Sequence, residues 1–259
     1  MNDTAKERWR RLEADYEAVA PLPVIGIIGL ATDRVGIPDF EDFLATASGR
    51  IAVFSTRIAM SPVATPATLA AMGAHLEAAA GLIVPHGRLD VVGFSCTSGT
   101  VAIGPDRVGA AITAARPGVA VSTPMQAGAK ALQRLGARRI ALLTPYLVPT
   151  AELVAGFFEA EGFSLAACAT FELGGDPEMN RVTADCLIGA ASDLAGRAGA
   201  SDAVFISCTG LRTFPVVARL EERLGKPVVT SNQALAWDCL RLAGVHDRLP
   251  GRGRLFAEA

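Results

Sequence analysis

The sequence lacks any long apolar run, although its mean hydropathy of +0.35 is high for a soluble protein. No stretch approaches the ~18 apolar residues that a membrane-spanning helix requires. The first ten residues, MNDTAKERWR, are polar and charged, with no apolar segment behind them, so no signal peptide is expected. We therefore expect a cytoplasmic protein that does not associate with a membrane.

The chain also lacks a surplus of either charge. It has 24 Lys+Arg against 26 Asp+Glu, for a formal net charge of −2. A nucleic-acid-binding domain normally carries a basic surplus, so no nucleic-acid partner is expected. Hydrophobic residues make up 51% and charged residues 19% of the 259 positions, the opposite of a disordered chain. Because a domain usually takes roughly 100–200 residues, one large domain or two small ones will fit.

Paired cysteine motifs are absent as well. There is no CxxC and no Cys/His cluster with zinc-ligand spacing, which predicts neither a disulfide framework nor a metal site. The five cysteines are an odd number and are widely spread: Cys96, Cys168, Cys186, Cys208 and Cys239.

Short β-rich segments alternate with helical ones, which predicts an α/β protein with parallel sheets. The predicted strands are 24–30, 50–56, 90–96, 118–123, 139–145, 164–170, 202–208 and 226–231. The predicted helices between them are 66–83, 103–116, 150–161, 180–198, 211–224 and 232–243. Residues 1–20, which include ERWRRLEADYEAV, predict a solvated N-terminal helix.

The two halves of the chain repeat each other. DVVGFSCTSGT at 90–100 matches DAVFISCTGLRT at 202–213, and STPMQAGAKAL at 122–132 is echoed by TSNQALAWDCL at 230–240. This pattern indicates two pseudo-symmetric Rossmann-like halves. We expect the first half to comprise 22–120 plus 231–259, and the second to comprise 121–230.

The repeat places Cys96 and Cys208 at matching strand ends, where ligands of open α/β sheets bind. The N–H groups of a helix start lower the pKa of a nearby thiol, so we expect Cys96 to be partly thiolate near neutral pH. Two cysteines facing each other across one cleft can move a proton, or add to a carbon, from opposite sides. Such chemistry needs no cofactor. The alternative is that each cysteine is a small buried hydrophobe, which is how we interpret Cys168, Cys186 and Cys239.

The segment Cys96-Thr97-Ser98-Gly99-Thr100-Val101-Ala102-Ile103-Gly104-Pro105 resembles the Asp/Glu racemase superfamily. Within it, the chain resembles the branch of maleate cis-trans isomerase and arylmalonate decarboxylase over about residues 22–245. Leu143–Tyr146 and Ser231–Ala234 with Trp237 also match motifs of this branch. Ser207–Thr213 and Ala31–Asp33 are most similar to the ectoine-utilisation family EutA.

This resemblance implies a cofactor-independent isomerase or racemase with the Asp/Glu racemase fold. Its substrate would be a small carboxylic or amino acid, such as an intermediate of ectoine degradation. Cys96 would be the nucleophile and Cys208 the acid. The implied cleft residues are Asp33, Thr97, Ser98, Tyr146, Asp176, Thr209 and Gly210. We also expect a homodimer or homotetramer.

Asp33 and Asp176 depart from the family, which carries Asn at the positions they resemble. An ionised Asp donates no hydrogen bond and repels a carboxylate, so a substrate bearing an ammonium group is favoured over maleate. The alternative is that both aspartates cap helices or bond within their loops. Two other functions stay open: maleate cis-trans isomerisation, and a sensor that binds a small molecule unchanged.

Overall fold

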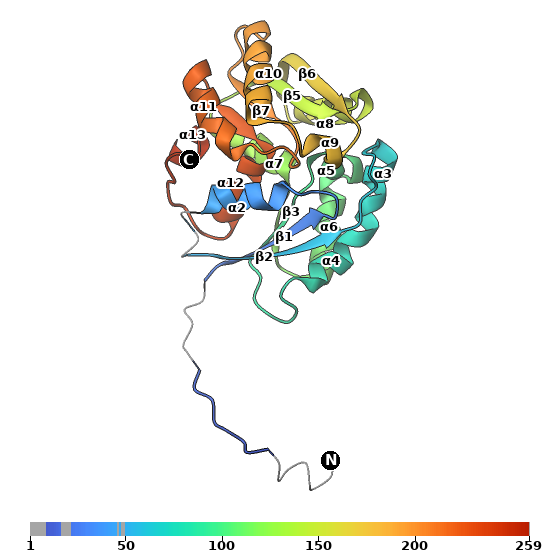
Figure 1. Cartoon of the computed structure of the whole chain (residues 1–259), viewed down its shortest axis with the longest axis vertical. Helices are drawn as coiled ribbons and strands as arrows, with labels where there is room; N and C mark the ends of the chain where they lie inside the picture. The colour runs from blue at the N-terminus through green and yellow to red at the C-terminus, as the bar shows by residue number, and fades with distance from the viewer. Residues whose placement is uncertain (1–8, 17–21, 46, 48–49, 259) are drawn as a thin grey trace.

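Two four-stranded sheets form the frame of the molecule (Figure 1), which was obtained as a computed structural model describing residues 9–16, 22–45, 47 and 50–258. The first sheet has the order β2-β1-β3-β4 and the second has the order β6-β5-β7-β8, with every neighbouring pair parallel. The strands are β1 Val24–Leu30, β2 Ala52–Ile58, β3 Val91–Phe94, β4 Ala120–Ser122, β5 Arg139–Tyr146, β6 Ser164–Leu173, β7 Ala203–Ile206 and β8 Val228–Thr230. The predicted α/β class with two halves of like topology is confirmed.

Helices cover both sheets because the central strands are apolar on both faces, as in β1, whose residues beyond Val24 are all buried. The helices are α2 Gly36–Leu44, α3 Pro66–Ala71, α4 Leu76–Leu82, α5 Thr97–Ile103, α6 Pro105–Ala115, α7 Pro124–Arg134, α8 Val148–Ala160, α9 Asp176–Met179, α10 Ala184–Arg197, α11 Phe214–Leu224, α12 Ser231–Leu242 and α13 Arg254–Glu258. The predicted helix 66–83 is divided into α3, a 3-10 turn at Met72–His75 and α4.

Helices α7 and α12 are exchanged between the halves. Helix α12 follows the last strand of the second sheet but packs against β3 and β4 of the first, and against α7. Helix α7 follows β4 and lies beside Phe205 of β7 and Phe158 of α8. One hydrophobic core therefore runs through both halves, while a second lies under α3, α4 and α6 on the outer face of the first sheet.

The division of the chain at residues 120 and 230 stays a proposal. Strand β4 continues to Ser122, so the boundary drawn at 120 falls within that strand.

The predicted N-terminal helix is wrong over residues 9–16, which have no regular secondary structure and extend away from the body (Figure 1). Residues 1–8 and 17–20 of that prediction lie outside the described residues. Trp9, Leu12 and Tyr16 are 77%, 74% and 90% exposed, so the large apolar side chains of this segment are not packed against the body. A short isolated helix without packing is only marginally stable in water, which explains the difference.

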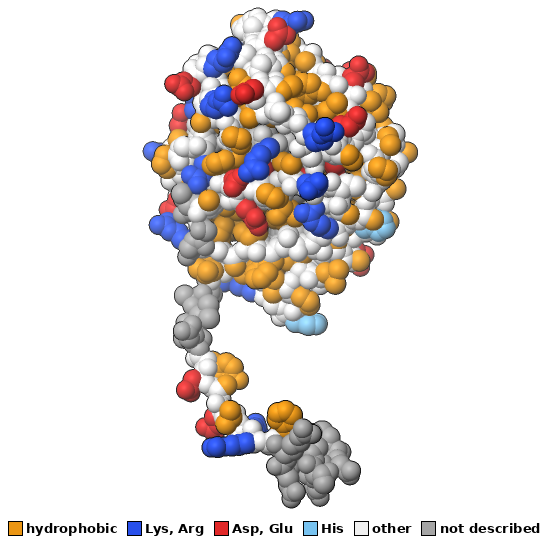
Figure 2. Space-filling view, in the orientation of Figure 1, with side chains coloured by type: hydrophobic (Ala, Val, Ile, Leu, Met, Phe, Trp, Pro, Cys, Tyr) orange, Lys and Arg blue, Asp and Glu red, His pale blue; other side chains and the backbone are white. Residues whose placement is uncertain are grey.

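Figure 2 shows acidic and basic side chains interspersed on the visible face of the body. In the described part of the chain, no helix combines the length and apolar character needed to cross a membrane.

Two glycines test the packing of α7. A Cβ at Gly128 would lie 2.7 Å from the ring of Phe205, whereas a Cβ at Gly109 of α6 meets no atom within 4 Å. Gly128→Ala should therefore lower the free energy of unfolding by about 1–3 kcal/mol through overpacking. Gly109→Ala should raise it by about 0.5–1 kcal/mol through helix propensity. Urea denaturation of both variants measures these changes, and equal effects would contradict the packing of α7 on the second sheet.

Candidate active site

The two cysteines of the repeated motif occupy equivalent places. Cys96 lies two residues beyond the end of β3, and Cys208 lies two residues beyond the end of β7. Strands β3 and β7 hold the same position in their sheets, beside β1 and β5. In each half, the second strand of the chain pairs with one side of the first strand and the third strand pairs with its other side. Open parallel sheets bind ligands where the strand order reverses in this way.

Both cysteines line one small cavity of about 10 Å³. Its lining comprises Leu30, Met60, Ala64, Leu69, Cys96, Thr97, Ser98, Tyr146, Asp176, Met179, Cys208 and Thr209. A volume of that size holds about one water molecule, so a substrate must displace part of the lining. The segment after β2, which supplies Met60 and Ala64, is tied across the cavity by a 2.9 Å hydrogen bond from the Ala64 N–H to the Gly174 carbonyl.

Cys96 caps the N-terminus of α5. Its Sγ accepts a 3.2 Å hydrogen bond from the N–H of Gly99, the interaction that the sequence predicted for a helix start. Burial, together with the negative charge of Asp176, outweighs that hydrogen bond and raises the pKa of the Cys96 thiol to about 12. The expectation of a partly ionised Cys96 is therefore wrong, because the side chain is only 4% exposed and the thiolate would lose its hydration.

Cys208 has an unusual backbone. Its φ of +109° lies in a region that side chains other than glycine rarely adopt. Its Sγ accepts a 3.3 Å hydrogen bond from the N–H of Gly210, and the thiol donates to the Sδ of Met179 at 3.8 Å. Burial raises the pKa of Cys208 well above its usual value, against a lowering by a hydrogen bond from Tyr146. Both thiols are thus held in the protonated form.

The hydroxyl groups predicted for the cleft lie around the two thiols. Thr97 and Ser98 follow Cys96 in the first turn of α5, and Tyr146 ends β5 beneath the second loop. The Thr209 hydroxyl donates to the carbonyl of Ser95 at 3.1 Å, linking the second cysteine loop to the first. Gly210 does not line the cavity; its N–H donates to Cys208 Sγ, and its carbonyl accepts a 3.2 Å hydrogen bond from the Asn180 amide.

The two aspartates have different environments. Asp33 does not line the cavity, and its carboxylate accepts hydrogen bonds from the N–H groups of Val35 and Gly36 at 2.8–3.0 Å. The alternative that Asp33 forms hydrogen bonds within its own loop therefore fits the structure better than a substrate contact. Asp176 lines the cavity and accepts a hydrogen bond from the Thr32 hydroxyl. Burial raises the pKa of Asp176, which makes proton uptake by this carboxyl easier.

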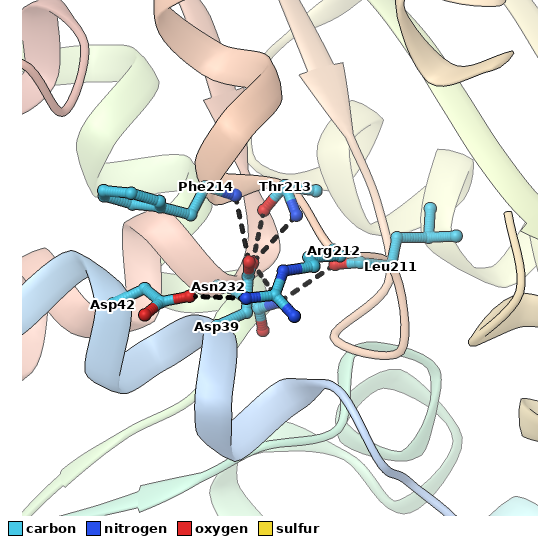
Figure 3. A network of polar contacts seen from close by, with 7 residues as sticks. All are labelled: Asp39, Asp42, Leu211, Arg212, Thr213, Phe214 and Asn232. Atoms are coloured by element: carbon cyan, nitrogen blue, oxygen red, sulfur yellow. Dashed lines mark hydrogen bonds and ion pairs between the residues drawn. The ribbon is translucent and has the colours of Figure 1, made fainter. Parts of the chain in front are cut away.

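A buried polar network lies behind the second cysteine loop (Figure 3). The Asp39 carboxylate of α2 accepts hydrogen bonds from the N–H groups of Thr213 and Phe214 at the start of α11, from the Thr213 hydroxyl and from the Asn232 amide. Burial raises the pKa of Asp39, while these four donors lower it. The network joins α2, α11 and α12, and so connects the two halves beside the cavity.

The sequence did not identify the apolar lining residues Leu30, Met60, Ala64, Leu69 and Met179, because no motif distinguishes them from core residues. The prediction that the remaining cysteines are packing residues is right for Cys239, which is buried, and wrong for Cys168 and Cys186, which are exposed. Cys168 lies on β6, the edge strand of the second sheet, and Cys186 lies in the first turn of α10.

A model of the arylmalonate decarboxylase family matches residues 106–256, a span that contains Cys208 and leaves out Cys96. The maleate isomerase of Nocardia farcinica is 32% identical over 212 residues, covering 79% of this chain and 83% of that protein. The arylmalonate decarboxylase of Bordetella bronchiseptica is 36% identical over 143 residues, covering 55% of this chain and 60% of that protein.

Solved structures of similar proteins share the fold. A mutant of the Nocardia farcinica maleate cis-trans isomerase, with a covalently bound succinylcysteine intermediate, superposes with a TM-score of 0.82 at 25% identity. That match covers 92% of this chain and all of that one. The maleate isomerase of Pseudomonas putida S16 with maleate gives a TM-score of 0.84 at 22% identity, over 92% of this chain and 99% of that one.

Thiol alkylation tests the electrostatics of the cavity. Iodoacetamide at pH 7.5 should modify the exposed Cys168 and Cys186 before the buried, protonated Cys96 and Cys208. Raising the pH by one unit should accelerate modification of Cys96 about tenfold, since the thiolate fraction rises tenfold per unit below the pKa. Peptide mass spectrometry follows each site separately. Modification of Cys96 ahead of Cys168 at pH 7.5 would instead restore the ionised thiol expected from the sequence.

Proposed function

Since this chain belongs to the arylmalonate decarboxylase and maleate isomerase family of the Asp/Glu racemase superfamily, we propose that it is a cofactor-independent isomerase or racemase of a small carboxylic or amino acid. One observation carries the proposal: two free cysteines at equivalent strand ends line the same cavity. A decarboxylase that used one cysteine would not need the other, and this chain keeps both.

The reaction requires one thiolate and one thiol. Both thiols are protonated in the empty site, so Cys96 must first give its proton to solvent or to a basic group of the substrate. The Cys96 thiolate either takes the proton from a substrate carbon or adds to one carbon of an alkene. The Cys208 thiol then gives its proton to the opposite face, or to the neighbouring carbon. No electrons are gained or lost, because each step moves a proton or forms a carbon–sulfur bond that later breaks. A thiol with a raised pKa becomes a strong base once it has lost its proton, which suits it to a weakly acidic C–H group.

The other cavity groups suit a carboxylate substrate. Thr97, Ser98 and Tyr146 bring hydroxyl groups to a site that holds almost no water, where hydrogen bonds to a charged group are strong. We assign these residues, with Thr209, to substrate binding. Gly210 acts through the hydrogen bond that its N–H donates to Cys208 Sγ. Asp33 would act on substrate binding only indirectly, by holding its own loop through hydrogen bonds to Val35 and Gly36.

Asp176 favours a substrate that also carries an ammonium group. It is the carboxylate in the cavity lining, and an ionised carboxylate attracts a cation and repels a second carboxylate. An amino acid or diamino acid derivative fits this arrangement. The further assignment to ectoine degradation rests on the motifs at Ser207–Thr213 and Ala31–Asp33 alone.

Maleate cis-trans isomerisation is the second candidate, and the matched maleate isomerases favour it. A protonated Asp176 would offer a hydrogen-bond donor to a maleate carboxylate, and burial raises the pKa of Asp176 in that direction. A sensor that binds its ligand unchanged would not need both thiols. We further propose that the enzyme works in the cytoplasm as a homodimer or homotetramer.

Hydrogen exchange tests the two-cysteine mechanism without knowledge of the product. Wild-type protein in D2O should exchange the Cα–H of its amino acid substrate, or convert maleate to fumarate, as followed by proton NMR on a panel of small amino acids and maleate. Cys96→Ser and Cys208→Ser should each lose a factor of about 10²–10⁴, the usual contribution of a general acid or base. Cys168→Ser, an exposed control, should keep the wild-type rate. Turnover that survives in both cavity variants would sink the proposal.

Asp176→Asn tests the preference for an ammonium group. Loss of one charge-assisted hydrogen bond costs about 1.5–3 kcal/mol, so affinity for amino-bearing ligands should fall roughly 10–150-fold. Maleate should bind more tightly to the variant. Binding of maleate to wild type should weaken as the pH rises, since Asp176 must hold a proton beside the substrate, and the variant should lack this dependence. Calorimetric titration at several pH values measures each effect, and unchanged ligand preference would leave maleate isomerisation as the better assignment.

A further inference from the structure

The strained backbone at Cys208 needs interactions that hold it. A non-glycine residue at a φ of +109° is unfavourable and persists only where its surroundings fix it. The backbone N–H of Cys208 is buried and donates a 3.0 Å hydrogen bond to the hydroxyl oxygen of Ser231. Ser231, the first residue of α12, is itself completely buried.

The same hydroxyl oxygen also contacts the other cysteine loop. Thr97, which directly follows Cys96, donates its hydroxyl proton to Ser231 Oγ at 2.9 Å. Ser231 Oγ thus accepts one hydrogen bond from each of the two loops that carry the cavity thiols. Both lone pairs of this oxygen are used, which fixes its position relative to both loops.

The next residue of α12 holds the remainder of the second loop. The Asn232 amide donates to the carbonyls of Thr209 and Leu211 at 3.0 and 3.2 Å, and to the Asp39 carboxylate at 2.9 Å. In Figure 3, Asn232 lies between Asp39 and the turn that carries Leu211. The first two residues of α12 therefore fix the chain from Cys208 to Leu211.

The other half has no equivalent of this arrangement. Helix α7 corresponds to α12 in the repeat and also begins after a capping threonine, yet its first two residues are Pro124 and Met125. Neither side chain carries a hydrogen-bonding group of the serine or asparagine kind. Cys96 correspondingly has an ordinary extended backbone, with φ of −152°.

We propose that Ser231 is the positioning residue of the site: its hydroxyl holds Cys208 in the strained conformation and fixes the Cys208 loop against the Cys96 loop. The inference rests on the proposed function for its catalytic consequence. Ser231 touches neither the cavity nor the reacting atoms, and it acts through the backbone of Cys208 and the side chain of Thr97. It makes the two thiols unlike each other, because the backbone N–H of Cys208 itself is held by a side chain of the other half.

Site-resolved alkylation tests the proposal without a substrate. Ser231→Ala removes one hydroxyl and leaves the rest of the chain intact. Iodoacetamide at pH 8.5 should then modify Cys208 about tenfold faster than in wild type, the ratio set by loss of one buried hydrogen bond of ordinary strength. Ser231→Thr, which retains the hydroxyl, should restore slow modification. The exposed Cys168 serves as the reference thiol within each sample.

Ser122→Ala is the matched control. Its hydroxyl is equally buried and donates to Asp238 at 2.6 Å, away from both cysteine loops. Loss of stability alone would accelerate modification of Cys208 in both alanine variants, and of the buried Cys239 in Ser231→Ala as well. Cys239 is not a reference in Ser122→Ala, because the Ser122 hydroxyl hydrogen-bonds its thiol. The proposal requires acceleration at Cys208 in Ser231→Ala, with Cys239 unchanged relative to wild type.

Kinetics add a second readout once a substrate is identified. Ser231→Ala should lower kcat about tenfold, with a smaller change in KM, and Ser231→Thr should recover kcat. If Cys208 in Ser231→Ala is modified at the wild-type rate, the proposal is overturned. An unchanged kcat in Ser231→Ala overturns it as well. Failure of the proposed function has a different signature, which is absence of turnover by the wild type on every compound tested.

Discussion

Loss of hydration in a closed cavity is the constraint on which the site depends. Burial is the largest influence on the pKa of Cys96, Cys208, Tyr146 and Asp176, and it raises all four. Hydrogen bonds from the N–H groups of Gly99 and Gly210 lower the thiol pKa values, but a weak hydrogen bond to sulfur does not replace a hydration shell. Burial therefore favours the neutral, protonated form of each of these four groups in the empty site. In the proposed reaction, a charged substrate entering the cavity would redistribute these protons, so binding and proton transfer would be coupled.

The sequence contained enough information for the frame of the site. Strand pattern and the repeated Ser-Cys-Thr segments place Cys96 and Cys208 at matching strand ends, because parallel strands end at one edge of a sheet whatever surrounds them. What the sequence did not reveal depends on neighbours distant along the chain. The raised pKa of Cys96 follows from its burial, and the exposure of Cys168 follows from its place on an edge strand.

Asp33 and Asp176 show the same limit within a single motif type. The resemblance gave both the same expected role, yet one carboxylate accepts hydrogen bonds from its own loop and the other lines the cavity. Residue type and position could not separate the two roles, since Asp favours loop hydrogen bonds and ligand contacts alike. Ser231 and Asn232 were visible only as part of a family motif, and their contacts with the second cysteine loop required the fold.

The exchange of α7 and α12 bears on how the protein forms during synthesis. Helix α12 spans Ser231–Leu242 and covers β3 and β4, so the first sheet lacks part of its cover until residues 231–242 have been made. The N-terminal half therefore cannot complete its core as an independent unit, although domains generally fold in the order in which they emerge from the ribosome. Contacts of such high sequence separation slow folding. They also make the two halves cooperative, because unfolding of either one uncovers the hydrophobic surface of the other.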